Sequence, residues 1–266
     1  MECFETVKSH KKIWIIVLAA AILCFICCLC YFFARKSDSD SLKEIQSIAY
    51  DTDKESTPSD STENYVETPV NFTELQKQNP DIYAWINIPG TVIDYPILRS
   101  DDDNSYYLEH TVDGKRSAYG SIYTEYYNDK EFGDFNTLIY GHNMKNGTMF
   151  GSLKKYRDRT FFEENQYINI YMPGRIMKYR IFAAYVYDDR HILLSFDFDE
   201  AEVRSSYLDM IFSTREMSAN IDNSVKVTED DKIITLSTCT SNDEERYLVQ
   251  AVLEADSELL NPPAAP

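Results

Sequence analysis

The stretch Lys232–Leu253, KIITLSTC followed by TSNDEE and RYLVQAVL, decides how the C-terminal part of this chain folds. Two runs rich in β-branched and apolar residues flank the short polar segment Thr240–Glu245, which is typical of two strands joined by a hairpin loop. Residues that face each other on neighbouring strands lie close together. The hairpin therefore predicts that Arg246 lies on the strand beside that of Cys239.

Other strand-like runs precede this hairpin, each bounded by polar, Gly, Pro or Asn residues. A capped helix is expected from Asn71 to about Pro80, and further helices at Met149–Tyr156 and Glu202–Phe212. About eight short strands with a few helices predict a mainly β protein, built as a small closed barrel with helical insertions. The expected strands are Ala84–Ile88, Val92–Leu98, Gly120–Tyr123, Thr137–Tyr140, Tyr167–Met172, Lys178–Tyr187, Ile233–Thr238 and Tyr247–Leu253.

The N-terminal part has a different character. Ile13–Phe33 is an uncharged apolar run whose 21 residues would form about 30 Å of helix, enough to cross a bilayer. It is longer than the apolar region of a cleaved signal peptide and ends in bulky residues, so we expect an uncleaved signal anchor. We expect residues 1–12 in the cytoplasm, an acidic disordered stalk over 34–70, the folded domain over 71–256 outside the cell, and a disordered tail over 257–266.

Composition excludes several classes of protein. The 266 residues carry a formal charge of −18, so binding to nucleic acid is not expected. The 44% hydrophobic content is ample for a packed core. Cys239 is the only cysteine of the predicted domain, which excludes a disulfide within it. No C-x-x-C metal pattern occurs outside the apolar run, and we expect neither a metal nor a cofactor.

Cys239 and His142 suggest nucleophilic catalysis, because a thiolate needs a proton acceptor and a donor for the leaving group. A lone cysteine is more often buried filler, and His110 or His191 could take the place of His142. Arg246 is the only basic residue after Cys239 and could steady a substrate carbonyl. Alternatively, Arg246 could simply form an ion pair with one of the adjacent carboxylates.

Thr-Leu-Ser-Thr-Cys precedes the candidate nucleophile, and Tyr-Gly-His-Asn-Met surrounds the histidine. Together with Arg246, these motifs resemble those of the class B sortases. The likeness extends over about Phe72 to Leu253 and includes Asp94-Tyr-Pro-Ile-Leu98, Asn104-Ser-Tyr-Tyr-Leu108, Gly120-Ser-Ile-Tyr123 and Met149-Phe-Gly-Ser-Leu153. The resemblance implies a sortase-like closed eight-stranded β-barrel, behind one transmembrane helix. It also implies a membrane-anchored cysteine transpeptidase of a Gram-positive surface.

The resemblance also implies roles for individual residues. Cys239 would attack the Thr carbonyl of a sorting signal, His142 would exchange protons with the amines, and Arg246 with the backbone N–H of Thr240 would hold the oxyanion. The partners would be surface proteins with a C-terminal sorting signal and an amine of a peptidoglycan precursor or a pilin. Residues matching the substrate groove are Asn104, Leu108, Tyr140 and Ser237, and Asp189–Asn223 matches a helix-bearing loop that helps select the signal.

The spacing from Cys239 to Arg246 is shorter than in some class B members, and Thr240 and Ser241 replace acidic residues. This departure bears on the substrate subtype. Three other functions remain open at this point: a cysteine peptidase that hydrolyses the thioacyl intermediate, a pilin-polymerising sortase, and a non-catalytic binding module on a stalk.

Overall fold

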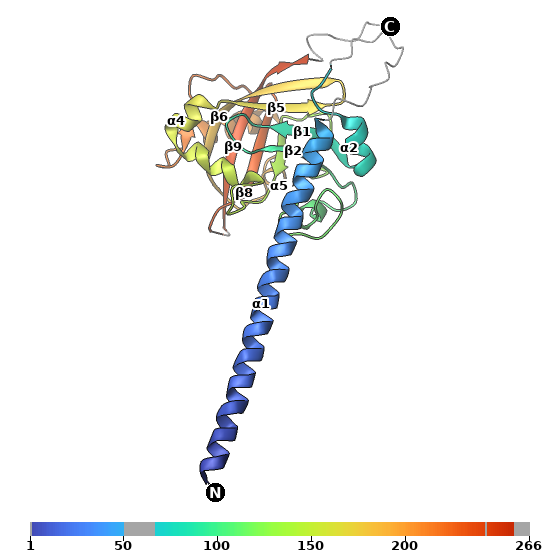
Figure 1. Cartoon of the computed structure of the whole chain (residues 1–266). Coiled ribbons are helices and arrows are strands. Elements are labelled where there is room, and N and C mark those ends of the chain that lie inside the picture. The colour runs from blue at the N-terminus through green and yellow to red at the C-terminus, as the bar shows by residue number, and fades with distance from the viewer. Residues whose placement is uncertain (1, 51–66, 243, 258–266) are drawn as a thin grey trace. The chain divides into compact units, whose positions relative to one another are not determined.

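The computed structural model describes residues 2–50, 67–242 and 244–257 of the chain (Figure 1). Two compact units divide it, Met1–Glu44 and Ile45–Pro266. Helix α1 spans Glu2–Ala49 and contains the predicted anchor segment. Within the described part of the chain, no helix has the length and apolar character needed to cross a membrane.

The last residues of α1, from Ile45 on, belong to the second unit, and α1 is helical through residues 34–49 of the expected stalk. Ile45 and Ala49, one helical turn apart, are buried in a cluster that includes Trp85. Nε2 of Gln46 donates a hydrogen bond to the backbone carbonyl of Asp94 at 2.8 Å. This apolar spacing creates a docking face that composition alone does not reveal. Residues 51–66 of the expected stalk and 258–266 of the expected tail lie outside the described residues.

The described strands form one sheet in the order β5-β1-β2-β3-β4-β8-β9-β6-β7, and a further pairing of β5 with β6 closes eight of them into a barrel. The predicted closed eight-stranded barrel is therefore confirmed, with the short strand β7 added beside β6. The strands are β1 Ile82–Asn87, β2 Asp94–Leu98, β3 Ile122–Tyr123, β4 Asn136–Tyr140, β5 Tyr167–Met172, β6 Arg175–Asp188, β7 Asn220–Ile221, β8 Ile233–Cys239 and β9 Glu245–Asp256.

Short helices connect and cover the strands. The predicted N-terminal helix is present, and Oδ1 of its cap residue Asn71 accepts a hydrogen bond from the Glu74 amide at 3.2 Å. The helix expected at Met149–Tyr156 is instead a 3-10 helix preceded by Met149 at φ 51°. The helices are α2 Phe72–Gln78, α3 Tyr106–Glu109, η1 Phe150–Arg157, α4 Arg159–Glu164, α5 Ile192–Ser195 and α6 Ala201–Phe212.

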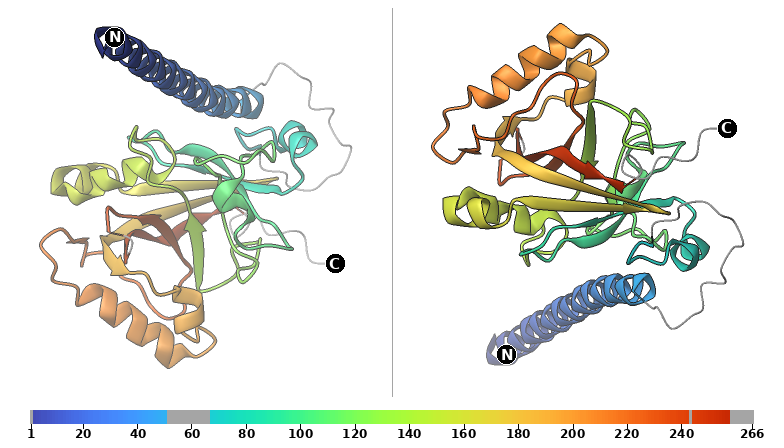
Figure 2. Two further views of the ribbon diagram at one scale, coloured as in Figure 1. Left: turned by 90° about the horizontal axis from the view of Figure 1, so that it is seen from below. Right: turned by 90° about the horizontal axis from the view of Figure 1, so that it is seen from above.

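The insertion between β6 and β8, which carries α5 and α6, covers one face of the barrel (Figure 2). Ile192 of α5 and Tyr207 and Ile211 of α6 are buried in one cluster with Leu138 of β4 and Leu248 of β9. This packing leaves the ends of β4 and β8 beside the start of the insertion. The residues predicted to carry chemistry lie at those ends.

Candidate active site

Cys239 and Arg246 face each other across the β8–β9 hairpin. Cys239 is the last residue of β8 and is exposed, and the antiparallel register pairs it directly with Arg246. The same register continues into β6, where Tyr187 is paired with Arg246. Since side chains of directly opposed residues share one face of a sheet, the thiol and the guanidinium lie on the same surface. The predicted neighbourhood of these two residues is confirmed.

His142 enters this surface from the neighbouring strand. β4 runs parallel to β8, with Tyr140 opposite Ser237, and the Gly141 amide donates to the Ser237 carbonyl at 3.2 Å. His142 follows at once and is partly buried. Its Nε2 lies 2.7 Å from the backbone carbonyl of Leu108.

Asn143 ties the histidine loop to the nucleophile. Its Nδ2 donates to the backbone carbonyl of Cys239 at 2.8 Å, which joins residues that are 96 positions apart. The loop closes through a bridge between Asn143 and Met149 and through a hydrogen bond from the Phe150 amide to the His142 carbonyl at 3.0 Å. Asn143 belongs to the motif around the histidine, but its position next to His142 in the sequence did not predict its hydrogen bond to the Cys239 carbonyl.

The hairpin loop holds its own acidic groups. The Glu245 carboxylate accepts from Oγ1 of Thr240 at 3.2 Å and from Nδ2 of Asn242 at 3.1 Å. The Thr240 amide, expected at the oxyanion, donates to the Glu245 carbonyl at 3.4 Å. That distance is longer than the usual range for an amide hydrogen bond. Nη1 of Arg246 donates to the same Glu245 carbonyl at 3.0 Å.

Glu125 organises a second polar group beside Tyr140. Its Oε2 accepts from the Tyr140 hydroxyl at 3.1 Å and from Nε2 of His191 at 2.6 Å. Burial, and next the negative charge of Glu125, raise the pKa of Tyr140 well above its ordinary value. Burial, then Glu125 and then Cys239, also raise the pKa of Tyr123, which stacks on Tyr140. The sequence did not indicate this group, because Glu125 and His191 are 66 residues apart.

The other predicted groove residues surround the same region. Leu108 is 39% exposed in α3, whereas Ser237 is buried on β8 between its partners on β4 and β9. Asn104 precedes α3, and its Oδ1 accepts from the Tyr126 amide at 2.7 Å, in the loop that carries Glu125. His110 is held elsewhere, stacked on Tyr106 with Nδ1 2.7 Å from the Tyr106 carbonyl.

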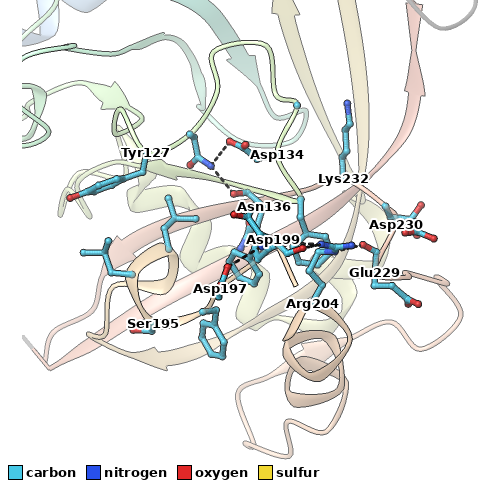
Figure 3. Close-up of a pocket in the computed structure, with 18 residues that line it drawn as sticks. Tyr127, Asp134, Asn136, Ser195, Asp197, Asp199, Arg204, Glu229, Asp230 and Lys232 are labelled. Carbon is cyan, nitrogen blue, oxygen red and sulfur yellow. Dashed lines mark hydrogen bonds between the residues drawn. The ribbon is translucent and has the colours of Figure 1, made fainter. Parts of the chain in front are cut away.

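A groove of about 950 Å³ lies at the opposite ends of β4 and β8, beside Asn136 and Lys232 (Figure 3). Asn136 and Tyr140 are four steps apart along β4, which places Asn136 roughly 13 Å along the strand from Tyr140. Its lining includes Asp134, Asp197 and Arg204. One end of its lining reaches toward the polar group of Glu125, because the lining residue Tyr127 packs edge-on against the ring of His191, with ring centroids 5.7 Å apart. Across residues 2–50, 67–242 and 244–257, no group of three or more His, Cys, Asp and Glu side chains could hold a metal ion.

Comparison with known proteins adds a family to this geometry. A family model described as a sortase domain matches residues 86–254. Sortase B of Listeria monocytogenes is 39% identical over 183 residues, which cover 68% of this chain and 72% of that protein. Sortase B of Staphylococcus aureus is 31% identical over 168 residues, covering 63% of this chain and 67% of that protein.

Solved structures agree with the sequence relatives. The crystal structure of sortase B from Bacillus anthracis in complex with AAEK1 superposes with a TM-score of 0.69 at 31% identity, covering 84% of this chain and 98% of that one. The range matched by the family model, residues 86–254, includes His142, Cys239 and Arg246.

Proposed function

The chain belongs to the sortase family, and on this premise we propose that its transpeptidase reaction runs through Cys239, His142 and Arg246. The substrate is a surface protein with a C-terminal sorting signal, which is cleaved after a Thr and joined to an amine of the cell wall. The observation that supports this assignment is the register that sets Arg246 opposite Cys239, with Asn143 binding the histidine loop to the Cys239 carbonyl.

Cys239 supplies the nucleophile. Its thiolate attacks the Thr carbonyl carbon, the C–N bond of the sorting signal breaks, and the departing amine takes a proton from His142. The acyl group is then held as a thioester on the cysteine. An incoming amine attacks that carbonyl, gives a proton to His142, and releases the thiolate. The exposed position of Cys239 at a strand end allows both partners to reach it.

Arg246 stabilises the oxyanion that develops in each step. A guanidinium offers several donors in a planar fork, which suits a carbonyl oxygen that gains negative charge. The Thr240 amide is the proposed second donor. Its bond to the Glu245 carbonyl is long at 3.4 Å, so a charged oxygen can replace that acceptor at small cost.

The sorting signal lies along the surface between β4, β8 and the insertion. Tyr140 and Ser237 are opposite each other on that surface, Leu108 is exposed at its rim, and Asn104 supports the neighbouring loop. The segment Asp189–Asn223, with α5 and α6, is the proposed selector of the signal. His191, from this segment, contacts Glu125 and so lies beside Tyr140.

The apolar run Ile13–Phe33 supports a single-pass membrane anchor with the N-terminus in the cytoplasm and the catalytic domain outside. Its uncharged 21 residues match the length that a bilayer requires. An enzyme anchored in this way meets surface proteins and peptidoglycan precursors at the same membrane.

The test is a peptide panel with and without an added amine. Parent protein should cleave one sorting-signal peptide and shift the product to the amide when a glycine or diaminopimelate amine is supplied. Hydrolysis that ignores the amine would indicate a peptidase, and transfer only to a pilin lysine would indicate a pilin polymerase. Cys239→Ala and His142→Ala should both be inactive, with His110→Ala as a matched control that keeps activity. Residual transfer by Cys239→Ala at a tenth of the parent rate or more would refute the nucleophile assignment.

A further inference from the structure

Helix α3 ends in a row of backbone carbonyls, and each has a hydrogen-bond partner. Three of these partners only stabilise the fold, whereas the partner of the Leu108 carbonyl is His142, the proposed acid–base residue. The contacts are Tyr106 O with Nδ1 of His110 at 2.7 Å, Tyr107 O with the Ser121 amide at 2.9 Å, Leu108 O with Nε2 of His142 at 2.7 Å, and Glu109 O with the Ser117 amide at 2.8 Å.

The chemistry of a carbonyl determines which nitrogen of His142 carries a proton. A carbonyl oxygen can only accept a hydrogen bond, so Nε2 must donate at this distance. A neutral ring that donates from Nε2 has its lone pair on Nδ1. Nδ1 is then the only nitrogen of His142 that can take up and release a proton while the contact with Leu108 persists.

Gly120 holds the Leu108 carbonyl in position. Its φ is +54°, and a Cβ placed on it would lie 2.4 Å from the Leu108 oxygen and 2.8 Å from the Tyr107 oxygen. Only a glycine allows the backbone to approach so closely. The amide of the next residue, Ser121, bonds the Tyr107 carbonyl, so the whole segment is pressed against the end of α3.

The backbone of His142 is held independently of its ring. The Gly141 amide bonds the Ser237 carbonyl, and the His142 carbonyl accepts from the Phe150 amide. Asn143 adds its bond to the Cys239 carbonyl. With the backbone held on both sides, the hydrogen bond to Leu108 is the contact that orients the imidazole.

We propose that the backbone carbonyl of Leu108, supported by Gly120, is the orienting acceptor of His142 and makes Nδ1 the nitrogen that exchanges protons during transfer. This inference rests on the proposed function. In many catalytic triads a third residue fixes the tautomer and the orientation of the base. Here the Leu108 carbonyl has that role. Leu108 and Gly120 are positioning residues in this scheme, since neither touches the reacting atoms.

The first test reads the tautomer directly. The full chain in detergent micelles, labelled with ¹⁵N at histidine, gives long-range ¹H–¹⁵N correlations that distinguish a protonated from a bare ring nitrogen. A matched His142→Gln sample assigns the signals among the four histidines. At a pH where the ring is neutral, we expect the proton of His142 on Nε2. A proton on Nδ1 would overturn the proposal without reference to activity.

The second test moves the carbonyl. Gly120→Ala places a methyl group against the Leu108 oxygen, and Gly114→Ala is the matched control. Gly114 also has a positive φ, +73°, but its added Cβ would meet only the Tyr106 hydroxyl, at 3.6 Å. We expect Gly120→Ala to lose the single tautomer and about 100-fold in kcat, the lower end for an acid–base group. KM for the peptide should change by less than about threefold. Gly114→Ala should match the parent in both measurements.

Several results separate the possibilities. A folded Gly120→Ala protein with the parent tautomer and kcat would overturn the role of Gly120. If Gly120→Ala does not fold, the tautomer of the parent still decides the role of Leu108. Transfer activity that persists in Cys239→Ala would refute the proposed function, whereas the ring tautomer would remain a valid measurement of the Leu108 contact.

Discussion

The buried ion pair between Arg175 and Asp256 joins the start of β6 to the end of β9, and its loss should strongly destabilise the domain. Nε and Nη2 of Arg175 donate to the two carboxylate oxygens of Asp256 at 3.1 and 2.7 Å. The side chains are 11% and 2% exposed. Nη1 of Arg175 also donates to the Glu131 carbonyl at 2.9 Å.

Asp256→Asn keeps the shape of the side chain and removes the buried counter-charge of Arg175, while the Glu131 carboxylate, 69% exposed and 3.7 Å from Nη1, remains. Breaking one side of a buried pair costs about 3–5 kcal/mol. For a domain of this size each kcal/mol corresponds to roughly 2–4 °C, so the melting temperature should fall by about 6–20 °C. The double variant Arg175→Met with Asp256→Leu removes both charges, and it should recover most of that loss because no charge remains buried.

The assay is thermal and urea unfolding of the parent and both variants, followed by circular dichroism. Glu163→Gln is the matched control, since Glu163 pairs with Arg159 on the surface, where both side chains are more than half exposed. An exposed pair contributes at most about 1 kcal/mol. The reasoning is refuted if Asp256→Asn costs no more than Glu163→Gln, or if the double variant is as unstable as the single one.

Three further predictions concern activity. Arg246→Lys should lower kcat/KM about 100-fold, because a point charge lacks the planar fork of the guanidinium; near-parental kinetics would argue for a generic charge effect. Asn143→Ala removes the 2.8 Å bond to the Cys239 carbonyl, worth about 1 kcal/mol, and should reduce kcat about fivefold in single-turnover assays; an unchanged rate would contradict a positioning role. Glu125→Gln exchanges a charged acceptor of Tyr140 for a neutral one and should raise KM up to about tenfold with kcat preserved; a loss in kcat alone would exclude a binding role.

Local pattern was enough for the features that depend on neighbours in sequence. The hairpin of β8 and β9 has a loop of a few residues, and such a loop restricts the strand register, so the pairing of Cys239 with Arg246 followed from the sequence. The cap at Asn71 and the alternation of β5 were predictable for the same reason. The barrel class also followed, since many short β-branched runs close on themselves rather than leave edges.

Elements whose conformation depends on distant partners were not predicted. The helix over residues 34–49 appeared as polar stalk, because only the surface around Trp85 makes burial of Ile45 and Ala49 favourable. The 3-10 turns of η1 follow a strained Met149, which is held by its bridge to Asn143. Intrinsic propensity is a weak guide wherever tertiary contacts can override it.

The same distinction applies to the residues of the candidate site. Residue types and motifs predict Cys239, His142 and Arg246 as the reactive set, because thiolate chemistry needs an acid–base partner and an oxyanion donor. Only the folded chain brings the Leu108 carbonyl to His142 and Glu125 to His191, since these contacts join residues 34 and 66 positions apart. The chemistry that a side chain can perform depends on its residue type, which the sequence gives directly. The orientation of a ring by a carbonyl depends on packing between strands and loops, and therefore only the tertiary structure decided it.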